Sequence, residues 1–581
     1  MSAPLSGRRW KKEKKAMNPQ DKQSAVLVVG AGVAGMQAAL DLADMGMKVY
    51  LLDRAPVIGG AVAQLERTLP EGQSSSCEVG AMFDAISHHP NIELITNADL
   101  QGISGEQGSF EIAIKKRAFR VTEKCDDCGA CYQVCPVKPY NTFNEGLTLR
   151  CAIDHQNYSF LPLIYNIEKE TPACQETCPV HIDIRRYVGL IAEGKFLEAL
   201  QVIRERNPLP SICGRVCHHP CEGMCNRGQQ DEPIAIEKLK RFAVDYEMNL
   251  RRQGLLPKLS APKKPTKEKV AIVGAGPAGL TCGHDLAKLG YEITIFEKES
   301  VPGGMLYLCI PEYRLPRDVI EYDVAFIRDL GVDIRLGTPI GKELTLDDLR
   351  KQGHKAIFLG IGAHKGLKLR VPGEDEFEGF IDCIEFLKRV NLGDKSKPGK
   401  RVIVIGGGNS AVDSARVALR LGCDEVYILY RRSRKEMPAN EWEVEEAEHE
   451  GVQIHYLAAP VKILGKNGRV TGMECTKMKL GKLDASGRRR PIPIKGSEFT
   501  IEADVIIPAI SQQPDISFLS EVHGLEISRW DSFVIDERTM QTNLPDVYAG
   551  GDAVTGPATV IEAIAAGHRA ASGIDRYLRA R

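Results

Sequence analysis

The sequence predicts an α/β protein with parallel sheets and a cysteine-rich, partly helical segment between them. Three stretches, beginning near residues 26, 270 and 401, share one order: apolar strand, glycine-rich turn, helix, second strand. Three such βαβ openings are typical of α/β architecture. Of the 17 cysteines, 12 lie between Cys77 and Cys225, and the stretches 184–205 and 232–250 show helical spacing.

Composition excludes several classes of protein. At about 150 residues per domain, 581 residues suggest about four domains. The 76 basic and 77 acidic residues nearly balance, which argues against a dedicated nucleic-acid binder. No apolar run is long enough to span a bilayer. The basic residues 1–17 are followed by the polar stretch NPQDKQS, not by the apolar stretch that an export signal requires. We therefore expect a cytoplasmic chain whose clustered cysteines bind metal or iron–sulfur clusters.

The second repeat has the pattern of a dinucleotide-binding turn. Its glycines permit a tight turn, close approach of a pyrophosphate and close helix packing, and an acid ends the next strand, where it can bind a ribose. These residues are Gly274, Gly276, Gly279, Glu297, Gly303 and Gly304. An ordinary tight turn between strand and helix is the alternative.

A second fingerprint follows much later in the chain. Gly551 and Asp552 precede a helix that begins near Thr559, which resembles the second FAD motif of flavoproteins with two dinucleotide-binding domains. In that resemblance Asp552 binds the ribityl chain and the helix N-terminus faces the flavin. The two halves of one FAD site would then bracket a nested domain.

The nested domain begins with its own glycine turn, formed by Gly406, Gly408, Asn409 and Ala411. Its second strand ends in Arg431 and Arg432, where an NAD site usually has a carboxylate. Guanidinium groups suit a phosphate dianion, so the sequence favours NADP(H) over NAD(H). Solvated arginines without such a role are the alternative.

The first repeat has only part of the pattern of an FAD site. It has glycines, an acid at the end of the second strand and a further glycine pair: Gly30, Gly32, Gly35, Asp53, Gly59 and Gly60. It has no Gly-Asp partner motif and no nested domain of its own. Two interpretations stay open: a second FAD site completed by a partner chain, or a unit that only packs.

The cysteines fall into two groups. Cys125, Cys128, Cys131 and Cys135, followed by Pro136, have the spacing of a bacterial ferredoxin run, whose fourth cysteine normally binds another cluster. Cys77, Cys151 or a later cysteine would then complete the first cluster; a zinc site is the alternative. The second group is Cys174, Cys178, Cys213, Cys217, Cys221 and Cys225. Twelve cysteines match three 4Fe–4S cubes, whereas two clusters with spare cysteines, or a ligand such as Glu237, fit equally well.

Residues from about 172 to 581 resemble the small subunit of NADPH-dependent glutamate synthase. They are also similar to the NADPH-binding subunit of electron-bifurcating ferredoxin–NADP transhydrogenase and to the N-terminal part of dihydropyrimidine dehydrogenase. The resemblance rests on ACQETCP, CGRVCHHPCEGMC, VGAGPAG, IPEYRLP, RRSRKEMPA and GGDA. It implies a helical Fe–S domain followed by an FAD domain that an NADPH domain interrupts.

The chain departs from that family at two places. The CxxC pair expected before Cys174 is missing between Asn166 and Lys169, and the position of a Gln or Glu cluster ligand holds Lys240. Residues 24–170 instead resemble part of the flavin- and Fe–S-containing subunit of heterodisulfide reductase, through GQSSSCEVG, HHPNIELIT, KCDDCGACYQVCPV and FNEGLTLRCAI, with Ser74 where that family often has a cysteine. We interpret the chain as a fusion of two electron-carrying modules.

Together these observations predict a modular order. After the tail 1–23 come a partial FAD-type module (24–120), a ferredoxin-like segment (121–170), a helical Fe–S domain (171–250), a linker (251–268), the first FAD part (269–395), an NADP domain (396–505) and the second FAD part (506–581).

The resemblance implies an electron-transfer flavoprotein subunit. NADPH would pass hydride to FAD and single electrons would leave through at least two 4Fe–4S clusters, with no general acid or base required. Expected partners are an NADH-oxidising flavoprotein, a hydrogenase, a formate dehydrogenase or a glutamate synthase large subunit, and also ferredoxin. The non-enzymatic alternative is a docking scaffold with a vestigial flavin site.

Overall fold

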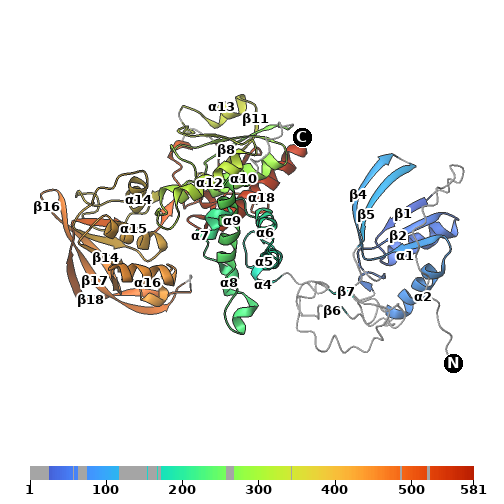
Figure 1. Cartoon of the computed structure of the whole chain (residues 1–581), viewed down its shortest axis with the longest axis horizontal. Helices are drawn as coiled ribbons and strands as arrows, with labels where there is room; N and C mark the ends of the chain where they lie inside the picture. Colours follow the sequence, from blue (N-terminus) through green and yellow to red (C-terminus); the bar gives the residue numbers. More distant parts are fainter. Residues whose placement is uncertain are drawn as a thin grey trace. The chain divides into compact units, whose positions relative to one another are not determined.

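The computed structural model divides the chain into two units, Met1–Thr171 and Pro172–Arg581, each described by itself (Figure 1). The described residues are 25–55, 58–62, 75–106, 108–116, 153–154, 166–167, 172–256, 267–341, 343–484, 487–519 and 524–580. Among the described helices, none combines the length and apolar composition that crossing a membrane requires.

The first unit contains a small parallel sheet in the order β1-β2-β3. Its strands are β1 (Ala25–Val29), β2 (Lys48–Leu52) and β3 (Ile92–Ile95), and its helices are α1 (Val33–Asp44) and α2 (Ser75–His88). The hairpin of β4 (Ala98–Glu106) and β5 (Ser109–Lys116) follows, and β6 (Ile153–Asp154) pairs with β7 (Asn166–Ile167). Met36, Leu51 and Ile86 belong to the core between helices and sheet. The first repeat thus forms the βαβ unit that its sequence predicts.

The second unit opens with the predicted helical module. Its helices are α4 (Ala173–Glu176), α5 (Ile184–Ala192), α6 (Phe196–Arg204), α7 (Pro210–Val216), α8 (Pro220–Gly223), η3 (Asn226–Gln229) and α9 (Ile236–Arg252). Helix α9 packs against α5, α6 and α7. A Cβ added to Gly214 would lie 2.9 Å from the Cα of Arg241, so α7 and α9 meet backbone to backbone.

A five-stranded parallel sheet in the order β10-β9-β8-β11-β21 forms the centre of the second unit. Its strands are β8 (Lys269–Val273), β9 (Glu292–Phe296), β10 (Asp333–Arg335), β11 (His354–Leu359) and β21 (Val547–Ala549). Its helices are α10 (Pro277–Lys288), α11 (Met305–Leu308), α12 (Arg317–Arg328), α13 (Leu346–Lys351), α17 (Asp552–Thr555) and α18 (Val560–Arg579). Because β21 pairs with β11 and α18 packs against α10, the C-terminal segment completes the sheet and the core that begin at β8, which together form the FAD-type module of the second unit (Figure 1).

The nested domain carries a second parallel sheet, in the order β15-β14-β13-β19. Its strands are β13 (Arg401–Ile405), β14 (Glu425–Tyr430), β15 (Gln453–Tyr456) and β19 (Val505–Pro508), with helices α14 (Cys383–Asn391), α15 (Asn409–Arg420), η4 (Arg434–Glu436) and α16 (Glu441–Glu450). An antiparallel sheet of β16 (Ala458–Lys466), β17 (Arg469–Leu483) and β18 (Arg489–Glu502) completes it. Where the chain enters and leaves, β12 (Lys365–Gly366) pairs with β20 (Gln512–Gln513), shortly before η5 (Ser517–Leu519).

The nested domain is larger than the range 396–505. Helix α14 precedes that range, yet its buried residues Cys383, Phe386 and Leu387 belong to the same core as those of α15. Strand β19 extends to Pro508. The two ends of the nested domain depend on which core α14 and β19 pack into. The local sequence pattern does not show that.

Candidate functional site

The turn after β8 forms the expected cradle. Gly274 has a φ of +102°, and a Cβ on Gly279 would lie 2.0 Å from the carbonyl oxygen of Gly274, so both positions require glycine. The carboxylate of Glu297, at the end of β9, accepts hydrogen bonds from the backbone N–H of Ala275 at 2.7 Å and of Glu299 at 2.9 Å. Burial raises the pKa of Glu297.

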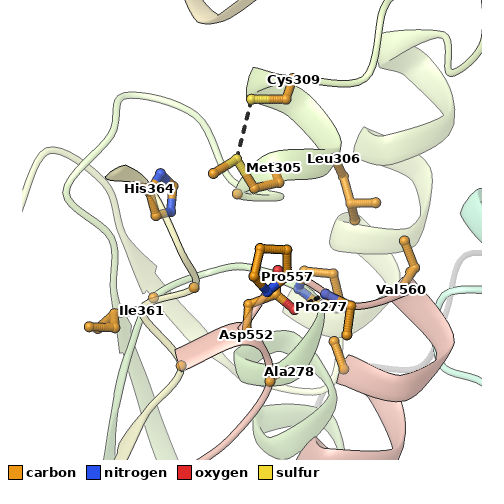
Figure 2. A pocket seen from close by; sticks show the side chains of 18 of the residues that line it. Pro277, Ala278, Met305, Leu306, Cys309, Ile361, His364, Asp552, Pro557 and Val560 are labelled. Atoms are coloured by element: carbon orange, nitrogen blue, oxygen red, sulfur yellow. Dashed lines mark hydrogen bonds between the residues drawn. The ribbon is translucent and has the colours of Figure 1, made fainter. Parts of the chain in front are cut away.

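A cavity of about 440 Å³ opens at this turn, a volume within the usual range for cofactor sites. Figure 2 shows that segments distant in sequence face it together: Pro277 of α10, Leu306 of α11 and Asp552 and Val560 of the C-terminal segment. The predicted FAD residues on its wall are Gly274, Gly276, Glu297, Gly304, Gly551, Asp552 and Thr559. The other two predicted FAD residues contact the turn rather than the cavity. Gly279 packs against the carbonyl oxygen of Gly274, and the N–H of Gly303 donates to the carbonyl of Ala275 at 2.8 Å.

The C-terminal fingerprint occupies the expected place. Thr559 caps α18, where its hydroxyl accepts from the N–H of Glu562 and the Glu562 carboxylate accepts from the Thr559 N–H at 2.9 Å. Asp552 accepts from the N–H of Ala558 at 3.2 Å, and burial raises the pKa of Asp552 to about 6. The glycine turn after β8, the carboxylate of Glu297 and the N-terminus of α18 all lie at one cavity. These are the groups that bind a dinucleotide, so the residues fit a bound FAD.

The nested domain contributes the N-terminus of α15 to the same cavity. Asn409, Ser410 and Asp413 lie on its wall. Gly406 and Gly408 belong to the turn before α15, and Ala411 is buried in the first turn of this helix. A Cβ on Gly406 would lie 2.2 Å from the carbonyl oxygen of Ala509, so the glycine is a packing requirement. The predicted nucleotide turn therefore exists and its helix faces the flavin-type cavity.

Arg314 is a site residue that the sequence motifs alone did not assign. Its guanidinium donates to Asp413 at 2.6 Å and also pairs with Glu443 of α16. These two ion pairs of Arg314 join the loop after α11 to the nested domain, at the wall of the cavity. Glu443 is buried, although the glutamate-rich stretch 441–450 reads as a solvated helix face. Arg314 lies within IPEYRLP, so the sequence displays the motif but does not identify the carboxylates that pair with this arginine.

The two arginines after β14 have different environments. Arg431 is exposed. Arg432 is buried; it donates to the Asp484 carboxylate at 2.6 Å and to the carbonyl of Arg489 at 2.8 Å. Partial burial of its side chain and the nearby charge of Arg432 lower the pKa of Arg431. The structure therefore leaves Arg431 available to a ligand, while Arg432 holds the β17–β18 hairpin against β14.

The six cysteines of the helical module lie in or beside α4, α7, α8 and η3. Cys217 and His218 lie on the wall of the flavin-type cavity. Burial and the nearby Cys225 raise the pKa of Cys174, and burial, Cys217 and Cys178 raise the pKa of Cys221. Within the described ranges, no three potential ligands are close enough to share a single metal ion. A 4Fe–4S cube differs, because each thiolate binds a different iron of the cluster.

Helix α9 carries the two residues that the sequence related to a cluster ligand, Glu237 and Lys240. Glu237 pairs with Lys238 at 3.0 Å. Lys240 is buried, and its pKa is raised: burial lowers it, but Cys217, Cys213 and Cys221 more than offset burial. The residue expected at a cluster-ligand position is thus a buried cation among thiols.

Asp323 of α12 fixes the start of α7. Its carboxylate accepts from the backbone N–H of Ser211 at 3.1 Å and of Ile212 at 3.0 Å, and burial raises the pKa of Asp323 to about 7. Helix α7 carries Cys213, so this contact positions the cysteine group relative to the FAD-type module.

Replacing Asp323 with Ala is expected to destabilise the second unit by roughly 2–4 kcal/mol, because two buried N–H groups lose their acceptor. Thermal or urea unfolding of the purified chain measures the change. Asp329→Ala, an exposed position at the end of the same helix, serves as the control. Equal stability of the two variants would contradict this role.

The turn after β1 repeats the contacts of the turn after β8. Asp53 accepts from the N–H of Ala31 and, at 2.7 Å, from that of Ala55. The N–H of Gly59 donates to the carbonyl of Ala31 at 2.7 Å. Gly30 has a φ of +100°, Gly32 caps α1, and Gly35 and Gly60 approach the turn closely. The turn after β1 thus has the same carboxylate and glycine contacts as the turn after β8.

Several predicted ligands cannot be placed. Cys125, Cys128, Cys131, Cys135 and Cys151 lie outside the described residues, and the side chain of Cys77 in α2 is likewise outside them. Cys309 lies on the cavity wall, where its thiol contacts the sulfur of Met305 at 3.2 Å (Figure 2).

Comparison with known families assigns each module. Residues 268–567 match the pyridine nucleotide-disulphide oxidoreductase family, which is more than half of the chain. Residues 167–252 match dihydropyrimidine dehydrogenase domain II, 4Fe-4S cluster; residues 25–101 match FAD dependent oxidoreductase; residues 119–140 match the 4Fe-4S binding domain. The matched families thus name 4Fe–4S domains on both sides of residue 171 and an FAD-dependent family at residues 25–101.

Three curated relatives are similar across about 70% of this chain. The NADP(+)-dependent formate dehydrogenase subunit beta of Moorella thermoacetica is 46% identical over 70% of this chain and 60% of its own length. The NADPH-Fe(3+) oxidoreductase subunit beta of Geobacter sulfurreducens is 46% identical over 71% of this chain and 64% of its own. The glutamate synthase [NADPH] small chain of Azospirillum brasilense is 35% identical over 71% of this chain and 87% of its own.

The match to the first two relatives thus spans less than two thirds of their length, while that to the glutamate synthase small chain spans most of it. Together with the family match and the paired fingerprints around one cavity, this similarity places the chain in the pyridine nucleotide-disulphide oxidoreductase family, as a member with FAD, NADP(H) and 4Fe–4S modules.

Proposed function

We propose that the chain is an electron-transfer subunit that oxidises NADPH at the cavity of the second unit and sends single electrons out through its cysteine modules. One observation carries the proposal: three modules line this cavity. The FAD-type module contributes Gly276 and Glu297, the nested domain Asn409 and the helical module Cys217. Electron input, storage and exit therefore meet within one cavity.

When bound, FAD supplies the conversion of a hydride from NADPH into single electrons. The chain's own residues bind and orient. Glu297 and the glycine turn hold the adenosine half, Asp552 and the N-terminus of α18 face the other half, and Arg431 reads the 2′-phosphate. No proton-transfer residue is required, because hydride transfer depends on orientation.

For the first unit we propose a second FAD site built on Gly30, Gly32, Gly35 and Asp53. Its turn has the same carboxylate and glycine contacts as the turn after β8. Among the described residues, this unit has no counterpart of β11 and β21, which complete the sheet of the second unit. A partner chain would supply that half of the site.

We further propose that the partner is another redox subunit. The relatives are named as beta subunits or a small chain. Candidates are an NADH-oxidising flavoprotein, a hydrogenase, a formate dehydrogenase and a glutamate synthase large subunit, with ferredoxin as a carrier and electron bifurcation as one mode of operation. A cytoplasmic location suits both NADPH and reduced thiols.

Anaerobic titration of the full chain with NADPH tests the proposal. We expect the flavin absorbance to bleach and cluster signals to appear in electron paramagnetic resonance. In Cys217→Ser the flavin should still bleach, while a cluster signal is lost because the exit beside the cavity is broken. Cys423→Ser, in the nested domain, is the control. A colourless protein, or a flavin that NADPH leaves oxidised, would overturn the proposal in favour of a docking scaffold.

A further inference from the structure

Arg314 connects two modules of the second unit through buried ion pairs. It belongs to the segment between α11 and α12 of the FAD-type module. Its guanidinium donates to Asp413 of α15 at 2.6 Å and also pairs with Glu443 of α16. The side chain of Arg314 is 16% exposed, and those of the two acids are 7% and 6% exposed. One cation of the FAD-type module is thus shared by two buried acids of the nested domain.

The rest of this segment is held by the same domain. The ring centroid of Tyr313 lies 4.8 Å from the guanidinium carbon of Arg416 and 4.0 Å from that of Arg420, both on α15. The same ring packs against the core of the nested domain. The side-chain amide of Asn391, at the end of α14, donates to the last carbonyl of α11 at 2.9 Å. Three helices of the nested domain therefore contact α11 or the segment that follows it.

The first turn of α16 also meets the helical module. Trp442, next to Glu443, stacks on His219 with ring centroids 5.2 Å apart and an angle of 20° between the two planes. Helix α16 packs against α15, whose first residues Asn409 and Ser410 lie on the cavity wall. The contacts that fix α16 therefore also fix the end of α15 that faces the flavin-type cavity.

The orientation of α15 decides where a bound NADP(H) would present its nicotinamide. Helix N-termini bind phosphate groups, so the end of α15 is suited to hold the pyrophosphate of this nucleotide. The glycine turn for the other dinucleotide belongs to the FAD-type module. Hydride transfer needs the reacting atoms within about 3–3.5 Å of each other, and a displacement of about 1 Å can slow such a step roughly a hundredfold. The contact between the two modules thus controls the reacting distance.

We propose that Arg314 is a positioning residue for hydride transfer, which holds the nested domain in the orientation that places NADPH against FAD. The inference rests on the proposed function, because it requires NADPH oxidation at this cavity. The hydride carries two electrons from NADPH to FAD, which leaves NADP⁺ and reduced FAD. Arg314 exchanges neither a proton nor an electron in this step; it acts through Asp413 and Glu443 on the distance between two modules.

Three variants of the full chain change this contact, and a fourth is the matched control. Arg314→Met removes the charge, whereas Arg314→Lys keeps it but lacks the planar fork that can serve two carboxylates at once. Glu443→Gln keeps the shape of a partner that, unlike Arg314, does not line the cavity. The control is Arg350→Met, because Arg350 pairs with Asp546 at 2.7 Å within the FAD-type module.

The rate of flavin bleaching after rapid anaerobic mixing with NADPH is the first readout. At saturating NADPH we expect Arg314→Met to be about tenfold to a hundredfold slower, with little change in the NADPH concentration that gives half the maximal rate. Glu443→Gln should change in the same direction, Arg314→Lys should lie between Arg314→Met and the wild type, and Arg350→Met should remain near the wild type. The double variant Arg314→Met/Glu443→Gln should be no slower than Arg314→Met, since both changes remove one contact.

Backbone hydrogen exchange of the chain without nucleotide is a second readout, which does not depend on activity. In Arg314→Met, exchange should become faster in residues 309–316 and in the first turn of α16, and stay unchanged in the five-stranded sheet. If Arg314→Met retains no flavin, Glu443→Gln supplies both measurements.

An unchanged bleaching rate in Arg314→Met would overturn the inference. So would a normal maximal rate that needs more NADPH, which would mean that Arg314 binds the nucleotide itself. Faster exchange throughout the second unit would overturn it as well, because the arginine would then serve general stability. A wild type whose flavin NADPH leaves oxidised would instead contradict the proposed function.

Discussion

Gly276→Ala is expected to leave the fold intact and to remove most of the FAD from the second unit. A Cβ at this position meets no protein atom within 4 Å, and the backbone φ of −78° suits alanine. Gly276 lies on the cavity wall, so the methyl group points at the space of the pyrophosphate. Such overpacking typically costs about 1–3 kcal/mol, or roughly a tenfold to hundredfold loss of affinity.

Flavin released per chain and the melting temperature together measure this outcome. The control is Gly189→Ala, at an exposed position of α5 where a Cβ also meets nothing within 4 Å. Gly32→Ala is the equivalent change in the first unit, where again nothing lies within 4 Å. If the first unit binds a second FAD, each variant should lose a different flavin. Full flavin content in Gly276→Ala would contradict the assignment of the cavity.

Arg431→Ala is expected to raise the Michaelis constant for NADPH on the order of tenfold or more and to change that for NADH little. Arg431 follows β14, where the 2′ position of a bound adenosine ribose lies in this fold. Charge-assisted hydrogen bonds to the 2′-phosphate contribute about 1.5–3 kcal/mol each. Flavin reduction with an artificial electron acceptor gives both constants.

Arg432→Ala provides the contrast. Its guanidinium is buried against Asp484 and the carbonyl of Arg489, so its loss should lower thermal stability and affect both nucleotides alike. A wild type that uses NADH as well as NADPH would remove the basis for a phosphate-reading role. So would an Arg431→Ala variant that loses both nucleotides equally.

Local sequence patterns predicted the turns correctly, for a physical reason. The positions of Gly274 and Gly279 are decided by backbone sterics within a few residues, so spacing alone identifies them. The same holds for the capped helix that starts after Thr559. The fold class and the position of these glycine turns therefore followed from short stretches of sequence.

Contacts between distant segments could not be predicted in this way. Both Arg431 and Arg432 looked available to a phosphate, and only the hairpin partner Asp484 separates their roles. Arg314 reads as an ordinary loop residue until the fold places Asp413 and Glu443 beside it. Helix α14 lies outside the expected range of the nested domain because its apolar face does not reveal which core it joins.

The sequence by itself determined that this chain holds paired dinucleotide turns around an inserted nucleotide domain, with cysteine groups spaced for clusters. Only the tertiary structure decided that Cys217, Asn409 and Asp552 share one cavity and that Arg314 pairs with two acids of the nested domain. The physical reason is distance along the chain. Turn geometry is set by neighbouring residues, whereas burial and charge pairing are set by segments that meet only when the whole unit packs.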